Sequence, residues 1–269
     1  MGYRVDYSCV SHIGNVRSIN QDNFFCDGKY FCMDNAALAF PLNGSLSCYQ
    51  PFMIGVFDGM GGEERGEIAS LIAAKCAAET SIRAKALDDL KVYCKNANEQ
   101  ICAYAAENGI CAMGTTAAIL AFTQKKITLC NIGDSKIFRF ANQKLEQISV
   151  DHYAVAPNGK KPPLSQNLGI PTSEMLIDPY FAKGAYHDGD VYLISSDGLT
   201  DMVSAEEITQ ILCRTAFDAT AEKLLATALE NGGKDNITVI LCRITQEKTS
   251  LFNSFFQSKK RRGENGNGN

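Results

Sequence analysis

Five aspartates in this 269-residue sequence share one setting, in which the acid adjoins an apolar run and usually has glycine or serine beside it. An apolar run predicts a buried strand, so each acid is expected at a strand end. The five residues are Asp22, Asp58, Asp134, Asp197 and Asp235. Together they suggest a single rim where strand ends converge. Carboxylates gathered so closely repel one another, and some would be forced to bind a proton.

Hard divalent cations relieve this repulsion, because Mg²⁺ and Mn²⁺ prefer oxygen ligands in octahedral geometry. A small residue after each acid lets a backbone carbonyl or a water molecule reach the ion. The chemistry that this pattern suggests is two-metal hydrolysis, most often of a phosphate ester.

The glycine-rich segment after Asp58 leaves other interpretations to test. A dinucleotide-binding turn needs G-x-G-x-x-G, but Glu64 occupies its last position, and Glu63 adds further negative charge where a diphosphate would lie. The sequence has no G-x-x-x-x-G-K-[ST] phosphate loop either. On this segment alone, a plain Asp-Gly turn between a strand and a helix stays open.

The composition is that of an ordinary globular chain, with 45% hydrophobic and 21% charged residues. A net charge of −4 argues against a nucleic-acid partner. The eleven cysteines are scattered without a C-x-x-C pair, so free thiols in a reducing cytosol are expected rather than a zinc site. The N-terminus has no apolar signal core, and no run is long enough to span a membrane, so we expect a cytoplasmic location.

Periodicity predicts the elements that hold the acids. Spacings of three and four predict helices around residues 68–76, 87–104, 204–214 and 219–231. Apolar runs predict strands over 4–11, 23–27, 51–57, 115–122, 126–133, 136–141, 145–149, 191–196 and 237–244. This order, with no interior linker, predicts a single α+β domain over residues 1–245, built of layered sheets and helices.

Residues 246–269 form a polar tail whose Gly/Asn-rich end is expected to be disordered. Leu251, Phe252, Phe255 and Phe256 precede the basic residues 259–262, so a weak membrane or partner anchor is conceivable. A solvated tail is the favoured interpretation.

Seven motifs in order resemble those of the metal-dependent protein phosphatases, the type 2C Ser/Thr phosphatases, in their bacterial form. They are "GNVRSINQD" (14–22), "FDGMGG" (57–62), "MGTT" (113–116), "NIGDS" (131–135), "VDH" (150–152), "SSDGL" (195–199) and "KDNIT" (234–238). Each motif alone is weak, but seven in the family's order cover nearly all of residues 3–244.

The resemblance implies a four-layer α/β/β/α sandwich with two central antiparallel sheets. It also implies hydrolysis of phosphoserine and phosphothreonine on proteins by a water that bridges two Mn²⁺ or Mg²⁺ ions. The partners would be phosphoproteins, as products of a Ser/Thr kinase. Nothing in the sequence reports on oligomeric state, so a monomer is the default expectation.

The resemblance also implies residue roles. Asp58 matches the acid that bridges both ions, and the Gly59 carbonyl matches a ligand of the second ion. Asp197 and Asp235 match the other ligands of the first ion, Asp134 matches the acid that holds a third, weaker ion, and Asp22 matches an acid near the second ion. Arg17 matches the phosphate-binding arginine, and a planar guanidinium can indeed grip two phosphate oxygens.

Departures from the animal enzymes leave two questions open. This chain has Gln21-Asp22 where those enzymes have two acids, and Met60 where they have a histidine proposed as general acid. His152 lies in a family motif but is interpreted as structural, so the general acid is not identified. The region 151–190, which carries a mobile flap in the family, is short here, so substrate preference is open.

Two rival functions fit the sequence less well. A non-catalytic phosphoprotein-binding module on the same fold would be expected to have lost a metal acid, and none is lost. A metal-dependent nuclease would favour a basic binding face, which the acidic balance opposes.

Overall fold

The structure is a computed structural model that describes residues 2–32, 38–60, 65–155 and 162–247. Two predicted features therefore lie outside the described residues. They are the glycine pair at positions 61 and 62 and the aromatic and basic tail that follows residue 247.

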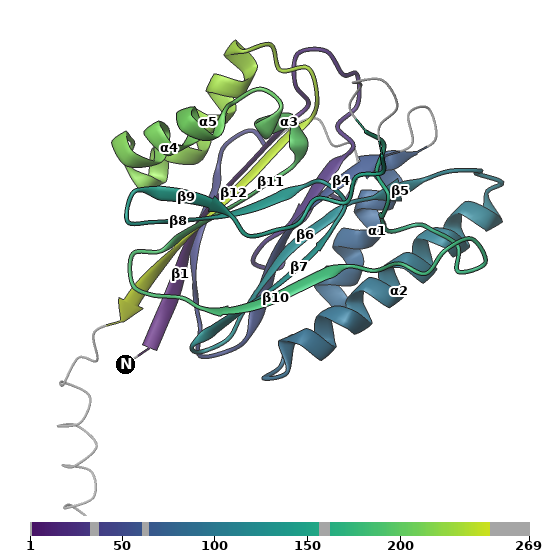
Figure 1. Ribbon diagram of the computed structural model, residues 1–269, viewed down its shortest axis with the longest axis horizontal. Helices are drawn as coiled ribbons and strands as arrows, with labels where there is room; N and C mark the ends of the chain where they lie inside the picture. Colours follow the sequence, from purple (N-terminus) through teal and green to yellow (C-terminus); the bar gives the residue numbers. More distant parts are fainter. Residues whose placement is uncertain (1, 33–37, 61–64, 156–161, 248–269) are drawn as a thin grey trace, which may run out of the picture.

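Two antiparallel sheets form the centre of the molecule (Figure 1). The first has the spatial order β3 (Leu42–Ser47), β1 (Gly2–His12), β12 (Ile237–Glu247), β11 (Val191–Ser195), β8 (Lys136–Ala141) and β9 (Lys144–Gln147). The second has the order β10 (Tyr180–Ala185), β7 (Lys126–Ile132), β6 (Ala117–Phe122), β4 (Phe52–Met60) and β2 (Asp22–Phe25), with β5 (Gly114–Thr115) paired to the end of β4.

Helices cover the outer face of each sheet (Figure 1). α1 (Gly66–Glu79) and α2 (Ala86–Glu107) pack on the second sheet. α4 (Ala205–Arg214) and α5 (Phe217–Glu230) pack on the first sheet, and the short α3 (Asp197–Thr200) follows β11 directly. The predicted α+β sandwich of four α/β/β/α layers is therefore confirmed.

Three apolar cores lie between the four layers. The central core, between the two sheets, includes Ile54, Leu120 and Ile240. Every residue of β6 is buried, because that strand has a sheet on one face and helices on the other. Continuous apolar runs, rather than alternating ones, are what such doubly covered strands require.

Some elements of the structure are not among those predicted from the sequence. β3, β10 and α3 are absent from the predicted elements, and β3 pairs with β1, which lies about 30 residues earlier in the chain, rather than with β2 or β4. β12 continues to Glu247, two residues past the predicted domain boundary. Among the described residues, no helix is both long and apolar enough to cross a bilayer.

Candidate active site

The five aspartates of the predicted rim lie where strands of both sheets begin or end. Asp22 and Asp58 are direct cross-strand partners in β2 and β4. Asp197 starts α3 immediately after β11, and the last residue of β11, Ser195, pairs with the first residue of β8. The remaining two acids occupy connections: Asp134 lies between β7 and β8, and Asp235 precedes β12.

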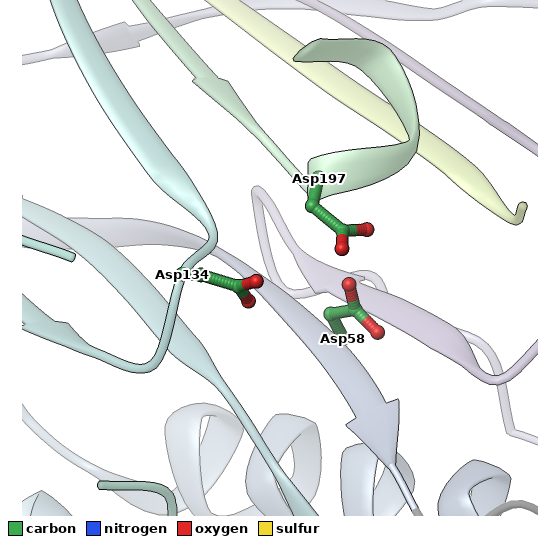
Figure 2. Close-up of side chains that lie close together, drawn as sticks. All are labelled: Asp58, Asp134 and Asp197. Carbon is green, nitrogen blue, oxygen red and sulfur yellow. The ribbon is translucent and has the colours of Figure 1, made fainter. Parts of the chain in front are cut away.

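The tightest group consists of Asp58, Asp134 and Asp197. Each contributes a carboxylate oxygen, and these oxygens lie within 4.8 Å of one another. Figure 2 shows the three side chains converging from β4, from the turn after β7 and from α3. Three carboxylates at that separation form a set of oxygen ligands suited to a hard divalent cation.

The electrostatics of Asp58 support the same interpretation. Burial raises the pKa of the Asp58 carboxyl well above its usual range, and the negative charges of the other four rim aspartates raise it further. Without a cation, the lowest free energy is reached when some of these carboxylates bind protons. A divalent cation at this position would compete with those protons and favour the ionised carboxylates.

Asp22 provides the most specific sign that a ligand belongs here. Its side chain is buried and accepts a hydrogen bond from the Ser196 hydroxyl at 2.7 Å through Oδ2. Its other oxygen, Oδ1, has no hydrogen-bond partner among the described residues. Burial raises the pKa of Asp22 to about 7, against the opposing effect of the Ser196 and Thr238 hydroxyls. A buried, unpaired carboxylate oxygen beside three other acids fits a metal ion or its bound water.

Arg17 and Asp235 form an ion pair at the edge of the rim. The Arg17 Nη2 atom donates to Asp235 Oδ2 at 2.7 Å, and both side chains are partly exposed. Asp235 is therefore engaged by the guanidinium, rather than belonging to the tight group of three. The negative charges of Asp58 and Asp197 also act on Arg17, so its guanidinium lies within their field.

Gly59 lies where two backbones approach closely. A Cβ atom at this position would come within 2.2 Å of the Gly66 carbonyl oxygen and 2.5 Å of the Gln21 carbonyl oxygen. Glycine is therefore required for α1 to start directly against the end of β4. The strand end is further fixed by Thr116, whose hydroxyl accepts from the Asp58 N–H at 3.0 Å and whose own N–H donates to the Asp58 carbonyl at 2.9 Å.

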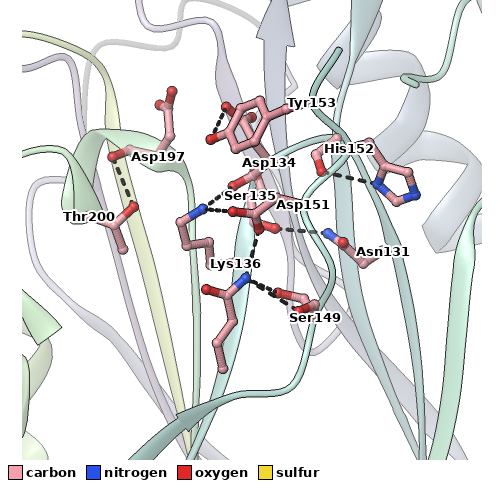
Figure 3. Close-up of polar contacts among 12 residues, drawn as sticks. Asn131, Asp134, Ser135, Lys136, Ser149, Asp151, His152, Tyr153, Asp197 and Thr200 are labelled. Atoms are coloured by element: carbon pink, nitrogen blue, oxygen red, sulfur yellow. Dashed lines mark hydrogen bonds and ion pairs between the residues drawn. The ribbon is translucent and has the colours of Figure 1, made fainter. Parts of the chain in front are cut away.

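The turn that carries Asp134 is fixed from both sides. Gly133 has φ +97°, a left-handed conformation that favours glycine, and lies against Thr116. The backbone N–H of His152 donates to the Gly133 carbonyl at 3.0 Å, and its ring nitrogen lies 3.2 Å from the same oxygen. These contacts agree with a structural role for His152. The Tyr153 hydroxyl donates to Asp134 Oδ2 at 3.2 Å (Figure 3).

Most of the residues that build the two sheets and the site match a known protein family. A family model described as protein phosphatase 2C matches residues 46–241, which include four of the five rim aspartates. The chain belongs to the protein phosphatase 2C family. The predicted family, and with it the predicted metal-dependent protein phosphatase, is confirmed.

Relatives named as phosphatases match between 72% and 88% of the chain. The serine/threonine phosphatase stp of Listeria monocytogenes is 28% identical over 85% of this chain and 91% of its own length. Protein phosphatase PhpP of Streptococcus pneumoniae is 30% identical over 72% of this chain and 87% of its own length. PstP of Mycobacterium tuberculosis is 29% identical over 88% of this chain, which covers 45% of PstP.

The fold of this phosphatase 2C chain is that of a solved relative. The catalytic domain of PstP, solved in complex with two manganese ions, superposes with a TM-score of 0.75 at 25% identity, over 91% of this chain and all of that domain.

Sequence reasoning missed three side chains that hold the site together. Asn236 joins two loops through three hydrogen bonds, and Tyr153 contacts Asp134. Lys136 forms a short ion pair with Asp151, shown in Figure 3, and its ammonium lies 5.7 Å from the Tyr153 ring centroid. Asn236 and Asp151 fall inside family motifs, so their positions gave a signal, but nothing in the sequence marked Tyr153.

Proposed function

We propose that this chain removes phosphate from phosphoserine and phosphothreonine of proteins at the aspartate rim, with two Mn²⁺ or Mg²⁺ ions as cofactor. The observation that carries the proposal is the convergence of Asp58, Asp134 and Asp197 beside the unpaired buried oxygen of Asp22. The guanidinium of Arg17, which would bind the phosphate, pairs with Asp235 at the edge of the same group.

The ligand assignment follows the positions of the acids. Asp58 lies within reach of the carboxylates of Asp134 and Asp197, which fits the bridging role that the family resemblance implies for it. Asp197, Asp235 and the Gly59 carbonyl would complete the binuclear set, and Asp22 would act through a water molecule. Asp134 would hold a third, weaker ion. Asp235 would exchange its present partner, Arg17, for an ion when the site is loaded.

Bound ions would supply a nucleophilic water at neutral pH and neutralise the charge on the phosphate oxygens. Arg17, released from Asp235, would orient the phosphate through two parallel hydrogen bonds, as a planar guanidinium does and a lysine ammonium does not. Thr116 and Ser196 would keep Asp58 and Asp22 aimed at the ions, because each donates or accepts a hydrogen bond at a fixed position in a strand end.

The setting proposed for this activity is the cytoplasm, with products of a Ser/Thr kinase as substrates. All eleven cysteines are free thiols, and several are buried, which fits a reducing compartment.

The proposal is tested by turnover of a phosphothreonine peptide with and without Mn²⁺. Chelation should abolish activity, and added Mn²⁺ or Mg²⁺ should restore it. Asp58→Asn should lower kcat by roughly 10³-fold or more, which is at the upper end of what removing one group aimed at developing charge costs. Full turnover by metal-stripped protein would refute the two-metal site. Binding of the peptide without turnover would indicate the non-catalytic module, and turnover of DNA but not of the peptide would indicate a nuclease.

A further inference from the structure

A cavity of about 360 Å³ lies between the C-terminal part of α2 and the segment that leads into β10. Figure 1 shows this segment passing over α2. The residues that carry the argument are Met60, Ile110, Met113, Ile170, Pro171 and Glu174, all of which line the cavity. No residue of the aspartate rim lines it, so the cavity is distinct from the metal centre.

The cavity begins directly beside the metal centre. Met60 follows Gly59 in β4, and these two residues pair with Gly114 and Thr115 of β5. Both Met60 and Gly114 line the cavity, while Gly59 is the proposed metal ligand. An extended peptide rises about 3.3 Å per residue. A substrate whose phosphorylated residue lies over the ions would therefore bring a neighbouring side chain to the cavity mouth.

The outer wall of the cavity is held in place before any substrate binds. The Asn98 side chain, on α2, accepts from the Gly169 N–H at 2.7 Å and donates to the Ile170 carbonyl at 2.9 Å. Leu168 exchanges two backbone hydrogen bonds with Thr115, of 2.9 and 3.0 Å. A preformed cavity binds a side chain without first having to order its own wall.

The lining is mostly apolar, with Asn167 as a polar side chain and Glu174 as a charged one. Among the described residues that line it, Glu174 alone is charged, and its side chain is exposed. Burial raises the pKa of the Cys102 thiol, and the negative charge of Glu174 raises it further, so Glu174 lies close enough to act on a residue of the lining. Apolar walls that end in a carboxylate match a long aliphatic stem that ends in a cation, as in arginine and lysine.

We propose that this cavity is a specificity subsite that receives an arginine or lysine side chain close to the phosphorylated residue of the substrate. The stem packs between Met60 and Ile170, and the cationic head pairs with Glu174. The inference rests on the proposed phosphatase activity and adds the sequence class of its substrates: phosphopeptides with a basic residue at one fixed flanking position.

The test measures kcat/KM for phosphothreonine peptides in which arginine, norleucine, glutamate or alanine is scanned through each flanking position. Every value is divided by kcat/KM for an aryl phosphate, which has no flanking residue. At one position, arginine should exceed norleucine by about two- to five-fold, the range that an exposed ion pair supplies. Glu174→Gln should remove this preference, and Glu174→Lys should reverse it in favour of glutamate.

The matched control is Glu107→Lys, because Glu107 is an exposed acid at the end of α2, the helix that forms one wall of the cavity, and is not among the cavity residues. It should keep the arginine preference. Ala106→Trp, which fills the cavity from α2, should raise KM by about ten-fold for peptides with arginine or norleucine at that position, through lost burial of the stem, and should leave the alanine peptide unchanged.

The inference is overturned if no flanking position prefers arginine, or if Glu174→Lys and Glu107→Lys have the same peptide-to-aryl-phosphate ratios. Absence of turnover on every peptide and on the aryl phosphate would instead refute the phosphatase proposal itself. The two failures are therefore distinguishable.

Discussion

Asn236 is the side chain on which the alignment of the two halves of the site depends, and Asn236→Ala tests this. It is buried, accepts a hydrogen bond from the Gln21 N–H at 2.8 Å, and donates to the carbonyls of Ile13 and Ile19 at 2.9 and 3.0 Å. The segment tied in this way carries Arg17, and Asn236 itself follows Asp235. One side chain thus connects the proposed phosphate-binding residue to the proposed metal ligand.

The expected magnitude follows from the three hydrogen bonds. Each buried group left without a partner costs about 1–3 kcal/mol, and partial access of water should place the sum near 3 kcal/mol. For a domain of this size, that loss should lower Tm by about 6–12 °C. A loosened segment misplaces Arg17, and a displacement of about 1 Å in such a group can cost up to roughly 10²-fold in rate. We therefore expect kcat/KM for a phosphopeptide to fall by about ten-fold or more.

The assay is urea unfolding of the metal-free variant together with phosphopeptide kinetics at saturating Mn²⁺. The control is Asn231→Ala, because Asn231 is exposed and its side chain makes one hydrogen bond, to the Met202 carbonyl. That variant should lose less than about 1 kcal/mol. Equal losses of unfolding free energy in the two variants, or unchanged kinetics in Asn236→Ala, would refute the reasoning.

Three further variants test other parts of the site and scaffold. Arg17→Ala should lower kcat/KM for a phosphopeptide by roughly 10²-fold, while calorimetry should find the same number of bound Mn²⁺ ions as in the wild type. Arg17→Lys should restore only part of the lost kcat/KM. Wild-type kinetics in Arg17→Ala would show that Arg17 is only a surface charge. Asp134→Ala should depress phosphopeptide turnover more than aryl phosphate turnover, since a serine alkoxide leaves less readily; equal losses would place Asp134 in the binuclear core. Burial raises the pKa of Asp89, but hydrogen bonds from the Arg83 side chain and N–H outweigh this and lower it. The ionised Asp89 carboxylate therefore stabilises the fold above about pH 4, and this contribution is lost as the pH falls through the lowered pKa. Asp89→Asn should lower Tm by about 2–4 °C at pH 7 and should have the Tm of the wild type in acid. A difference in Tm that does not change with pH would contradict this role of Asp89.

The sequence predicted the elements whose burial leaves a regular pattern. β6 is apolar throughout, as are residues 52–57 of β4 and 239–242 of β12, and α2 repeats its buried positions at helical spacing. β10 escaped prediction because it is the edge strand of the second sheet and is half exposed, so it shows no alternation. α3 is a single turn, too short to show any period.

The site was predictable as a set of residues but not as a geometry. Each acid could be placed at a strand end, because a polar residue after an apolar run leaves the core there. Which acids meet depends on the connections. Gly133 turns Asp134 towards Asp58, and Asn236 holds the segment in which Arg17 reaches Asp235. Tyr153, which contacts Asp134, belongs to no periodic element, so no pattern pointed to it.

The clustered aspartates of the rim lower the free energy of unfolding of the metal-free protein, and the rest of the fold must offset this loss. Asp22 and Asp58 face each other across adjacent strands, and both carboxyls have raised pKa values because they are buried beside other acids. Unfolding separates these charges and returns them to water, so the repulsion acts on the folded state alone. The three apolar cores, and strand ends fixed by contacts such as Gly59 against Gly66, keep the carboxylates together despite it. A cation that binds this rim and not the unfolded chain therefore stabilises the fold as it completes the site, and metal binding and folding are coupled through the same carboxylates.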